Sequence, residues 1–139
     1  QNDIMIQLHS VYKIVQKFAK KMTNIENSKI IFTLTSAIFN TPKFNTNYLI
    51  VKYSLLGLMK SLSKEYLGKI QINAISPSMI QTKFLENLPD FIIEQTAQNS
   101  PLKRNAQTKD VIPLVEFLLS DNSNYIHGQN ILIDAGVHL

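Results

Sequence analysis

Tyr48 and Lys52 are the side chains whose types and spacing most directly suggest chemistry. They lie four residues apart in "NYLIVKYSLLG", Asn47 to Gly57, which has the pattern of an amphipathic helix. Both should therefore lie on one helix face, one turn apart. An ammonium near a phenol favours the phenolate, and such a tyrosine can exchange a proton with a carbonyl oxygen. The spacing also fits two long side chains on an ordinary core helix, because five tyrosines and 14 basic residues make chance pairs common.

The segments before and after this helix bear on the choice between the two interpretations. The apolar stretch "IIFTLTS" ends at Ser36, twelve residues before Tyr48, and "NAISPSMIQT", Asn73 to Thr82, is a strand stopped by Pro77 and followed by a loop. Residues just beyond the carboxyl ends of parallel strands line a ligand crevice. Ser36 could then donate a hydrogen bond to the carbonyl that Tyr48 protonates, or it could simply satisfy local backbone groups.

The remaining elements follow from helical periodicity, β-forming composition and turn residues. They alternate in type, which implies an α/β fold with a doubly wound parallel sheet and right-handed crossovers. Strands that are apolar on both faces fit a sheet covered on both sides. Asn47 and Thr108 are expected helix caps, and Pro113 should destabilise the helix that contains it. The expected helices are Asp3–Met22, Tyr48–Leu67, Phe84–Ala97 and Thr108–Leu119; the strands are Lys29–Thr35, Lys69–Ser76 and Asn130–Asp134; a polar loop spans Ser36–Asn47.

The first strand is a candidate sheet edge without polar protection. Three strands make a small sheet, and an apolar edge invites pairing with another chain. We expect a further strand beside "KIIFTLT", from sequence that this chain does not contain.

Composition predicts one globular domain, residues 1–139, with 45% apolar and 17% charged residues. No apolar run reaches the ~20 residues of a membrane span, no signal peptide is visible, and the start on Gln1 suggests a fragment or a processed chain. The absence of cysteine excludes disulfides and thiolate metal sites and is compatible with the cytoplasm. The net charge of +4 comes from scattered lysines, which predicts no nucleic-acid partner, and the histidines lack metal-ligand spacing.

Taken in order, these segments resemble the C-terminal half to two-thirds of a short-chain dehydrogenase/reductase, most closely the members that reduce 3-oxoacyl groups on acyl carrier protein. "KIIFTLTS" resembles the strand that ends in the catalytic serine, "YLIVK" the Tyr-x-x-x-Lys motif, and "GLMKSLSKEY" the rest of that helix. "INAISPSMIQT" resembles the strand and Pro-Gly-x-x-x-Thr loop that holds the nicotinamide. "PLKR" and "VEFLLSDNSNYIHGQNILIDAG" resemble the closing helix, the Gly-Gln turn and the Asp-Gly-Gly strand end.

The resemblance implies a role for each matching catalytic position. Tyr48 matches the general acid/base, Lys52 the residue that favours the phenolate and binds the nicotinamide ribose, and Ser36 the donor that polarises the carbonyl. NAD or NADP would supply the hydride. Gln7 falls where the family often has an asparagine, so its longer arm puts the proton relay in doubt. Thr35 is a reserve candidate, because the family's serine more commonly precedes the tyrosine by thirteen residues.

The cofactor loop carries further matches and departures. Pro77, Ile80 and Thr82 match loop positions near the nicotinamide, and residues 83–98 match the variable lid over the substrate. Ser78 and Ala135 each replace a family glycine. We expect Ser78 to matter more if its position needs a positive φ.

The largest departure concerns the phosphate-binding half of a Rossmann-like fold. None of the four glycines forms a GxGxxG pattern, so we expect the C-terminal portion only and poor dinucleotide binding by this chain alone. The resemblance implies a small-molecule or acyl-carrier-linked carbonyl substrate and a homodimer or homotetramer formed through the helices at Asp3–Met22 and Tyr48–Leu67. The alternative is a truncated or degenerate member that acts as a non-catalytic binding or assembly module.

Overall fold

The core of the protein is a parallel sheet of three strands in a computed structural model that describes residues 4–43 and 46–139. The strands are β1 (Lys29–Thr33), β2 (Gln71–Pro77) and β3 (Asn130–Ile133), and β2 lies in the centre. Ile31 is in register with Asn73, and Ile75 with Ile131. The prediction of a parallel sheet is confirmed, with each strand found within two residues of its expected position.

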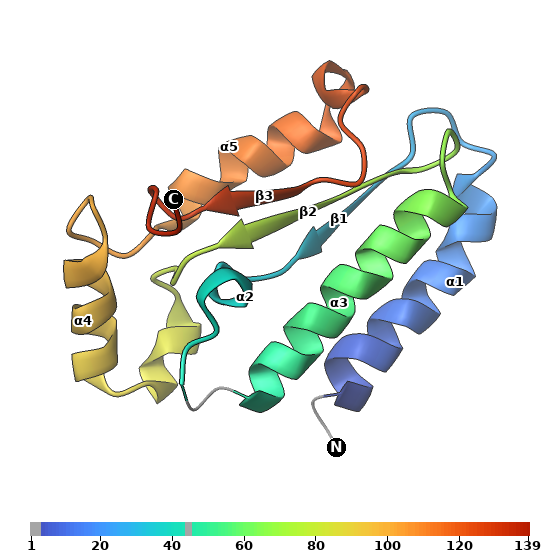
Figure 1. Cartoon of the computed structure of the whole chain (residues 1–139). Helices are drawn as coiled ribbons and strands as arrows, with labels where there is room; N and C mark the ends of the chain where they lie inside the picture. The colour runs from blue at the N-terminus through green and yellow to red at the C-terminus, as the bar shows by residue number, and fades with distance from the viewer. Residues whose placement is uncertain (1–3, 44–45) are drawn as a thin grey trace.

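Helices cover both faces of the sheet, as a doubly wound fold requires (Figure 1). On one face, α1 and α3 pack over β1 and β2, and α5 lies on the other face. The helical elements are η1 (a π-helix, Ile4–His9), α1 (Ser10–Met22), α2 (Ala37–Asn40), α3 (Thr46–Glu65), η2 (a 3-10 helix, Lys83–Asn87), α4 (Asp90–Asn99), α5 (Thr108–Leu119) and η3 (a 3-10 turn, Asp121–Ser123).

Two apolar clusters fix these layers. The larger joins Val15 of α1, Phe32 of β1 and Met59 of α3, and Met59 is fully buried. The smaller is centred on Ile75 of β2 and Leu118 of α5. Alternate residues of a strand point to opposite faces, so an apolar strand such as β2 supplies both clusters at once.

Two predicted elements differ from the structure, each for a local reason. The polar loop contains α2, whose start is supported by a hydrogen bond of 3.3 Å from the Ala37 N–H to the Thr35 hydroxyl. The helix expected at Phe84–Ala97 is interrupted at Pro89, which has ψ 135° and therefore separates η2 from α4.

The expected helix caps also differ from the observed ones. α3 already begins at Thr46, so Asn47 lies inside it. Gln107, not Thr108, is the N-cap of α5, in a capping box with Asp110. Pro113 does lie inside α5, on its exposed side, where water can solvate the carbonyl four residues earlier that loses its helical partner.

β1 has one side without a neighbouring strand in the described chain. The N–H groups of Leu34 and Ser36 donate to β2 carbonyls at 2.8 and 2.9 Å. In a parallel pair alternate residues turn their backbone groups to the same side. Lys29, Ile31 and Thr33 therefore turn their N–H and C=O groups to the open side, as expected for a sheet edge.

Candidate functional site

Ser36 lies where β1 passes into α2, at the carboxyl end of the sheet. It is 7% exposed, and its N–H donates to the Pro77 carbonyl at 2.9 Å. It stands at the N-cap of α2, but its hydroxyl makes no capping hydrogen bond to that helix. The backbone of Ser36 is therefore fixed while its hydroxyl is not used to cap the helix that follows.

Tyr48 and Lys52 come together in the first turns of α3. The Lys52 ammonium lies 5.6 Å from the centroid of the Tyr48 ring, and both side chains are half-buried. Desolvation by burial lowers the pKa of Lys52. Lys52 Nζ also donates to the Thr33 carbonyl at 3.3 Å, on the open side of β1. The expectation that both side chains share one helix face is confirmed.

An open groove beside β1 brings Gln7 to the same place. Its volume is about 400 Å³, and it lies between α1, β1 and α3. Gln7, Thr33 and Lys52 form its polar part, and apolar side chains such as Ile14 and Leu55 form the rest. Gln7 lies within the π-helix η1, a rare geometry that often accompanies functional sites. The sequence indicated a helix here, and nothing in its propensities distinguished a π-helix from an α-helix.

The cofactor-loop residues follow β2. Pro77 is buried, and its carbonyl holds Ser36. Ile80 packs on the cluster around Ile75 and forms an isolated bridge with Ala106. Thr82 is exposed in extended backbone before η2. Neither Ile80 nor Thr82 lines the groove that holds Lys52. Of the three residues, Pro77 accepts the backbone hydrogen bond from Ser36.

The two replaced glycines differ in backbone conformation. Ala135 has φ 57°, in the left-handed region that favours glycine, whereas Ser78 is not among the described residues with positive φ. The condition under which Ser78 would matter more is therefore not met, because the left-handed backbone occurs at Ala135. The reserve candidate Thr35 uses its hydroxyl to accept the Ala37 N–H at 3.3 Å.

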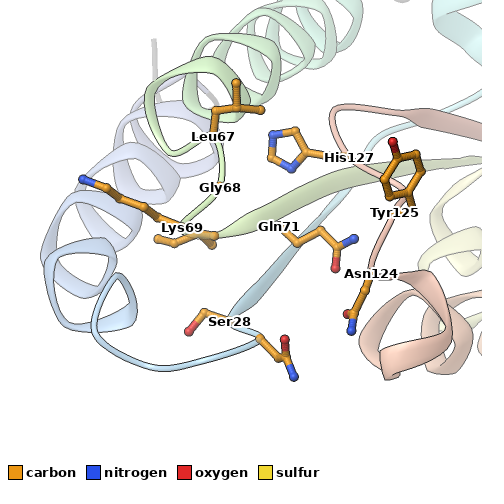
Figure 2. Close-up of a pocket in the computed structure, with 10 residues that line it drawn as sticks. Ser28, Leu67, Gly68, Lys69, Gln71, Asn124, Tyr125 and His127 are labelled. Atoms are coloured by element: carbon orange, nitrogen blue, oxygen red, sulfur yellow. The ribbon is translucent and has the colours of Figure 1, made fainter.

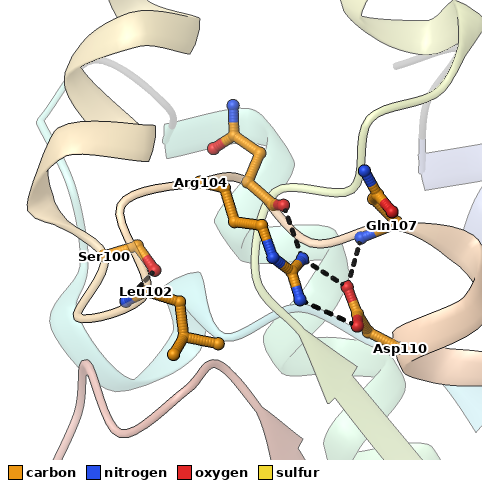
Figure 3. A network of polar contacts seen from close by, with 6 residues as sticks. Ser100, Leu102, Arg104, Gln107 and Asp110 are labelled. Carbon is orange, nitrogen blue, oxygen red and sulfur yellow. Dashed lines mark hydrogen bonds and ion pairs between the residues drawn. The ribbon is translucent and has the colours of Figure 1, made fainter.

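An ion pair fixes the loop that returns from the lid region to α5 (Figure 3). Arg104 contacts both carboxylate oxygens of Asp110, at 2.6 and 3.0 Å, and the Gln107 N–H donates to the same carboxylate at 2.7 Å. The Arg104 hydrogen bond, followed by that of Gln107, lowers the pKa of Asp110 to about 2. The "PLKR" segment thus has a structural role in the start of α5.

A second pocket lies at the opposite, amino ends of the strands (Figure 2). Its volume is about 380 Å³, and Leu67, Gln71 and His127 are among the residues that line it. Gln71 Nε2 is bonded to the Ile126 carbonyl at 2.7 Å, and His127 Nε2 lies 2.8 Å from the Ser63 carbonyl. These polar groups connect loops, and none of the predicted site residues lines this pocket.

Three polar side chains that support α2 had no signal in the sequence. Tyr53 of α3 donates to the Ile38 carbonyl of α2, and Asp134 pairs with His138 at 2.6 Å beside α2. Their contacts join α2 to distant segments, so they could be recognised only in the folded chain. In the described residues, no group of three His, Cys, Asp or Glu side chains could hold a metal ion, and no helix is long and apolar enough to cross a membrane.

The family model and the similar curated relatives point to related enzymes. The family model described as "Enoyl-(Acyl carrier protein) reductase" matches residues 1–138. A 3-oxoacyl-[acyl-carrier-protein] reductase of Thermotoga maritima is 32% identical over 136 residues, which cover 96% of this chain and 55% of that protein. The corresponding reductase of Buchnera aphidicola is 31% identical, over 98% of this chain and 56% of that protein. The chain thus spans about half the length of these relatives.

Solved structures share the fold. A dehydrogenase from Beutenbergia cavernae with bound NADP superposes with a TM-score of 0.88 at 24% identity, covering 95% of this chain and 54% of that chain. A 3-oxoacyl-[acyl-carrier protein] reductase from Brucella melitensis with bound NAD gives a TM-score of 0.82 at 19% identity, covering 98% of this chain and 50% of that chain. From the family match and the parallel sheet together, the chain belongs to the short-chain dehydrogenase/reductase family of oxidoreductases.

Proposed function

We propose that this chain is the proton-handling part of an NAD(P)-dependent oxidoreductase that interconverts a carbonyl and an alcohol, with Tyr48 as the general acid/base. The observation that carries the proposal is the Lys52 ammonium, 5.6 Å from the Tyr48 ring centroid. A cation so placed favours the phenolate that forms when the tyrosine gives up its proton. Ser36 follows the strand that lies beside this pair and would donate a hydrogen bond to the same substrate oxygen.

The end of the groove at Lys52 suits the ribose of a dinucleotide. The Lys52 ammonium and the Gln7 amide supply donors there for sugar hydroxyls. When bound, the nicotinamide would supply or accept the hydride. Lys52 would hold the ribose, and the loop that carries Pro77, Ile80 and Thr82 would hold the carboxamide end. The residues for the pyrophosphate remain a prediction for sequence outside this chain, because no GxGxxG pattern occurs in it.

A 3-oxoacyl group linked to acyl carrier protein is the substrate class we propose. The curated relatives carry that activity in their names, whereas the family model carries the name of an enoyl reductase. The Tyr48 phenol and the Ser36 hydroxyl can both donate a hydrogen bond to an oxygen atom that gains negative charge. A carbonyl oxygen gains such charge when a hydride adds to its carbon. Assembly as a homodimer or homotetramer and a cytoplasmic location remain predictions from the resemblance.

The test joins this chain to the portion of the Thermotoga maritima reductase that precedes the matched region and has no counterpart in this chain. Oxidation of NADH and NADPH is then followed with a panel of 3-oxoacyl and other carbonyl substrates. Removal of the general acid in Tyr48→Phe should lower kcat by about 10²–10⁴-fold. Tyr125→Phe is the matched control, because Tyr125 is fully exposed. The mechanism is wrong if the joined protein turns over and Tyr48→Phe leaves kcat unchanged.

A further inference from the structure

α2 is too short to hold its own conformation. It spans four residues, and its backbone hydrogen bonds run from the Phe39 N–H to the Ser36 carbonyl at 2.9 Å and from the Thr41 N–H to the Ala37 carbonyl at 3.0 Å. A single helical turn is unstable alone, because too few hydrogen bonds offset the loss of backbone freedom. Contacts from elsewhere must therefore hold α2, and with it the backbone of Ser36 at its N-cap.

The first such contact comes from the helix that carries Tyr48 and Lys52. Tyr53, directly after Lys52, donates its hydroxyl proton to the Ile38 carbonyl of α2 at 2.5 Å. Ile38 is itself buried in the larger apolar cluster. One side chain of α3 thus connects the element that bears the proposed acid/base to the element that bears the proposed hydrogen-bond donor.

The second contact comes from the C-terminal segment after β3. The His138 ring packs against the Phe39 ring of α2, with centroids 6.4 Å apart and the planes tilted by 44°. Asp134 holds this segment in place: its carboxylate accepts from the Gly136 N–H at 2.9 Å and from the His138 N–H at 3.1 Å. The same carboxylate lies 2.6 Å from His138 Nδ1.

Burial shows that this pair is part of the packed interior. Asp134 is 8% exposed, and the His138 side chain is 10% exposed. The other ring nitrogen, Nε2, is buried and has no hydrogen-bond partner among the described residues. Because a buried nitrogen without a partner is unfavourable, the carboxylate bond and the contact with Phe39 must determine where the ring lies.

We infer that Tyr53 and the Asp134–His138 pair are positioning residues that hold α2, and thereby Ser36, from two sides. Tyr53 fixes α2 relative to the helix of Tyr48, and His138 fixes it relative to the end of β3. The inference rests on the proposed function, because it assigns the two contacts to the placement of the Ser36 hydroxyl. The positioning acts through α2, since neither contact involves the Ser36 side chain.

Amide hydrogen exchange of the 139-residue chain tests the contacts without any assay of activity. Tyr53→Phe removes only the hydroxyl, and His138→Phe keeps a ring beside Phe39 but loses the bond to Asp134. Each should raise the exchange rates of the Phe39 and Thr41 amides by about tenfold, the loss of one typical hydrogen bond. The Leu118 amide in α5 serves as the internal reference, and Tyr125→Phe as the control variant. Unchanged exchange at Phe39 in both variants would overturn the inference.

Kinetics of the joined protein test whether the contacts act through Ser36. Tyr53→Phe should lower kcat about tenfold and leave the KM for the dinucleotide unchanged, and it should add nothing in a Ser36→Ala background. A general structural defect would lower kcat equally in both backgrounds, and that result would overturn the positioning role. If the joined wild-type protein shows no turnover, the proposed function fails, and exchange at Phe39 alone decides whether the two contacts hold α2.

Discussion

Ala135 shows how a single residue in this chain departs from the conformation that its type prefers. Ala135 has φ 57°, and the next residue, Gly136, has φ 85°. The backbone therefore turns sharply where β3 ends. This turn returns the C-terminal segment to Asp134, whose carboxylate binds the Gly136 and His138 amides. A methyl group on a left-handed backbone is unfavourable, and here it accompanies a turn that the contacts of Asp134 stabilise.

Ala135→Gly should raise the free energy of unfolding by about 0.5–1 kcal/mol. The relief of left-handed strain exceeds the greater backbone freedom that glycine brings to the unfolded chain. Urea denaturation of the two proteins measures the difference. Ala97→Gly, within α4, is the control and should destabilise by about 1 kcal/mol. A destabilising effect of Ala135→Gly would show that the methyl group makes a favourable contact.

Asp110 should make stability depend on pH in the acid range. Its hydrogen bonds to Arg104 and to the Gln107 N–H lower its pKa from 3.8 to about 2 in the folded chain. A carboxyl whose pKa is lowered by folding stabilises the protein above its unfolded pKa, and that stabilisation is lost as the pH falls from about 3.8 to about 2.

Denaturation midpoints measured across this range should fall more steeply in the wild type than in Asp110→Asn. Arg104→Gln should narrow the pH range over which stability is lost, because it removes the largest cause of the lowered Asp110 pKa. Identical pH profiles for wild type and Asp110→Asn would contradict this assignment.

β1 is the element whose environment is least complete. Its open side presents the backbone groups of Lys29, Ile31 and Thr33 beside a largely apolar groove. The Lys52 ammonium donates a hydrogen bond to the Thr33 carbonyl. Lys52 belongs to α3, and a charged group placed against a sheet edge hinders unwanted pairing. We expect a parallel strand from outside this chain to pair here, and Lys52 would then leave the Thr33 carbonyl.

Ile31→Pro should prevent that pairing and leave the chain folded. The Ile31 N–H faces the open side, so its loss spares the bonds between β1 and β2. Phe32→Pro is the contrasting variant: it removes an N–H that faces β2 and should unfold the strand. Binding of the separately produced preceding portion of the Thermotoga maritima reductase, measured by calorimetry, should weaken at least tenfold in Ile31→Pro. Equal binding by wild type and Ile31→Pro would place the partner elsewhere.

At the scale of the whole molecule, large apolar side chains are exposed on α1 and α3. Ile14 and Phe18 of α1 are 57% and 50% exposed, and Ile50 of α3 is 48% exposed. Ile14 and Phe18 lie four residues apart and so share one helix face. Apolar surface of this kind often marks contact with another protein, which agrees with the predicted homodimer or homotetramer.

Phe18→Glu should shift the chain toward the monomer, because a charge in an apolar contact costs desolvation energy. Sedimentation measures the mass at several concentrations. Ile25→Glu is the matched control, since Ile25 is 60% exposed but lies in the loop after α1. A wild-type chain that remains monomeric at all concentrations would contradict the prediction.

The sequence by itself determined the fold class and most elements, because the periodicity of apolar residues is a local signal. α5 was predicted with both ends correct, and the three strands were found in their expected order. The pairing of Tyr48 with Lys52 was also predictable, since four residues on a helix fix their relation whatever surrounds them. The break at Pro89 is also a local signal, because proline disfavours a helical conformation in the residue before it.

Only the tertiary structure decided which residues meet across the chain. Gln7 and Lys52 share a groove because η1 and α3 pack together beside β1, and no local pattern encodes that proximity. The strain at Ala135 rather than Ser78 depends on how β3 turns back toward α2. The contacts of Tyr53 and His138 with α2 likewise join segments far apart in sequence. Such contacts arise from the packing of whole elements, whereas periodicity and spacing describe one element at a time.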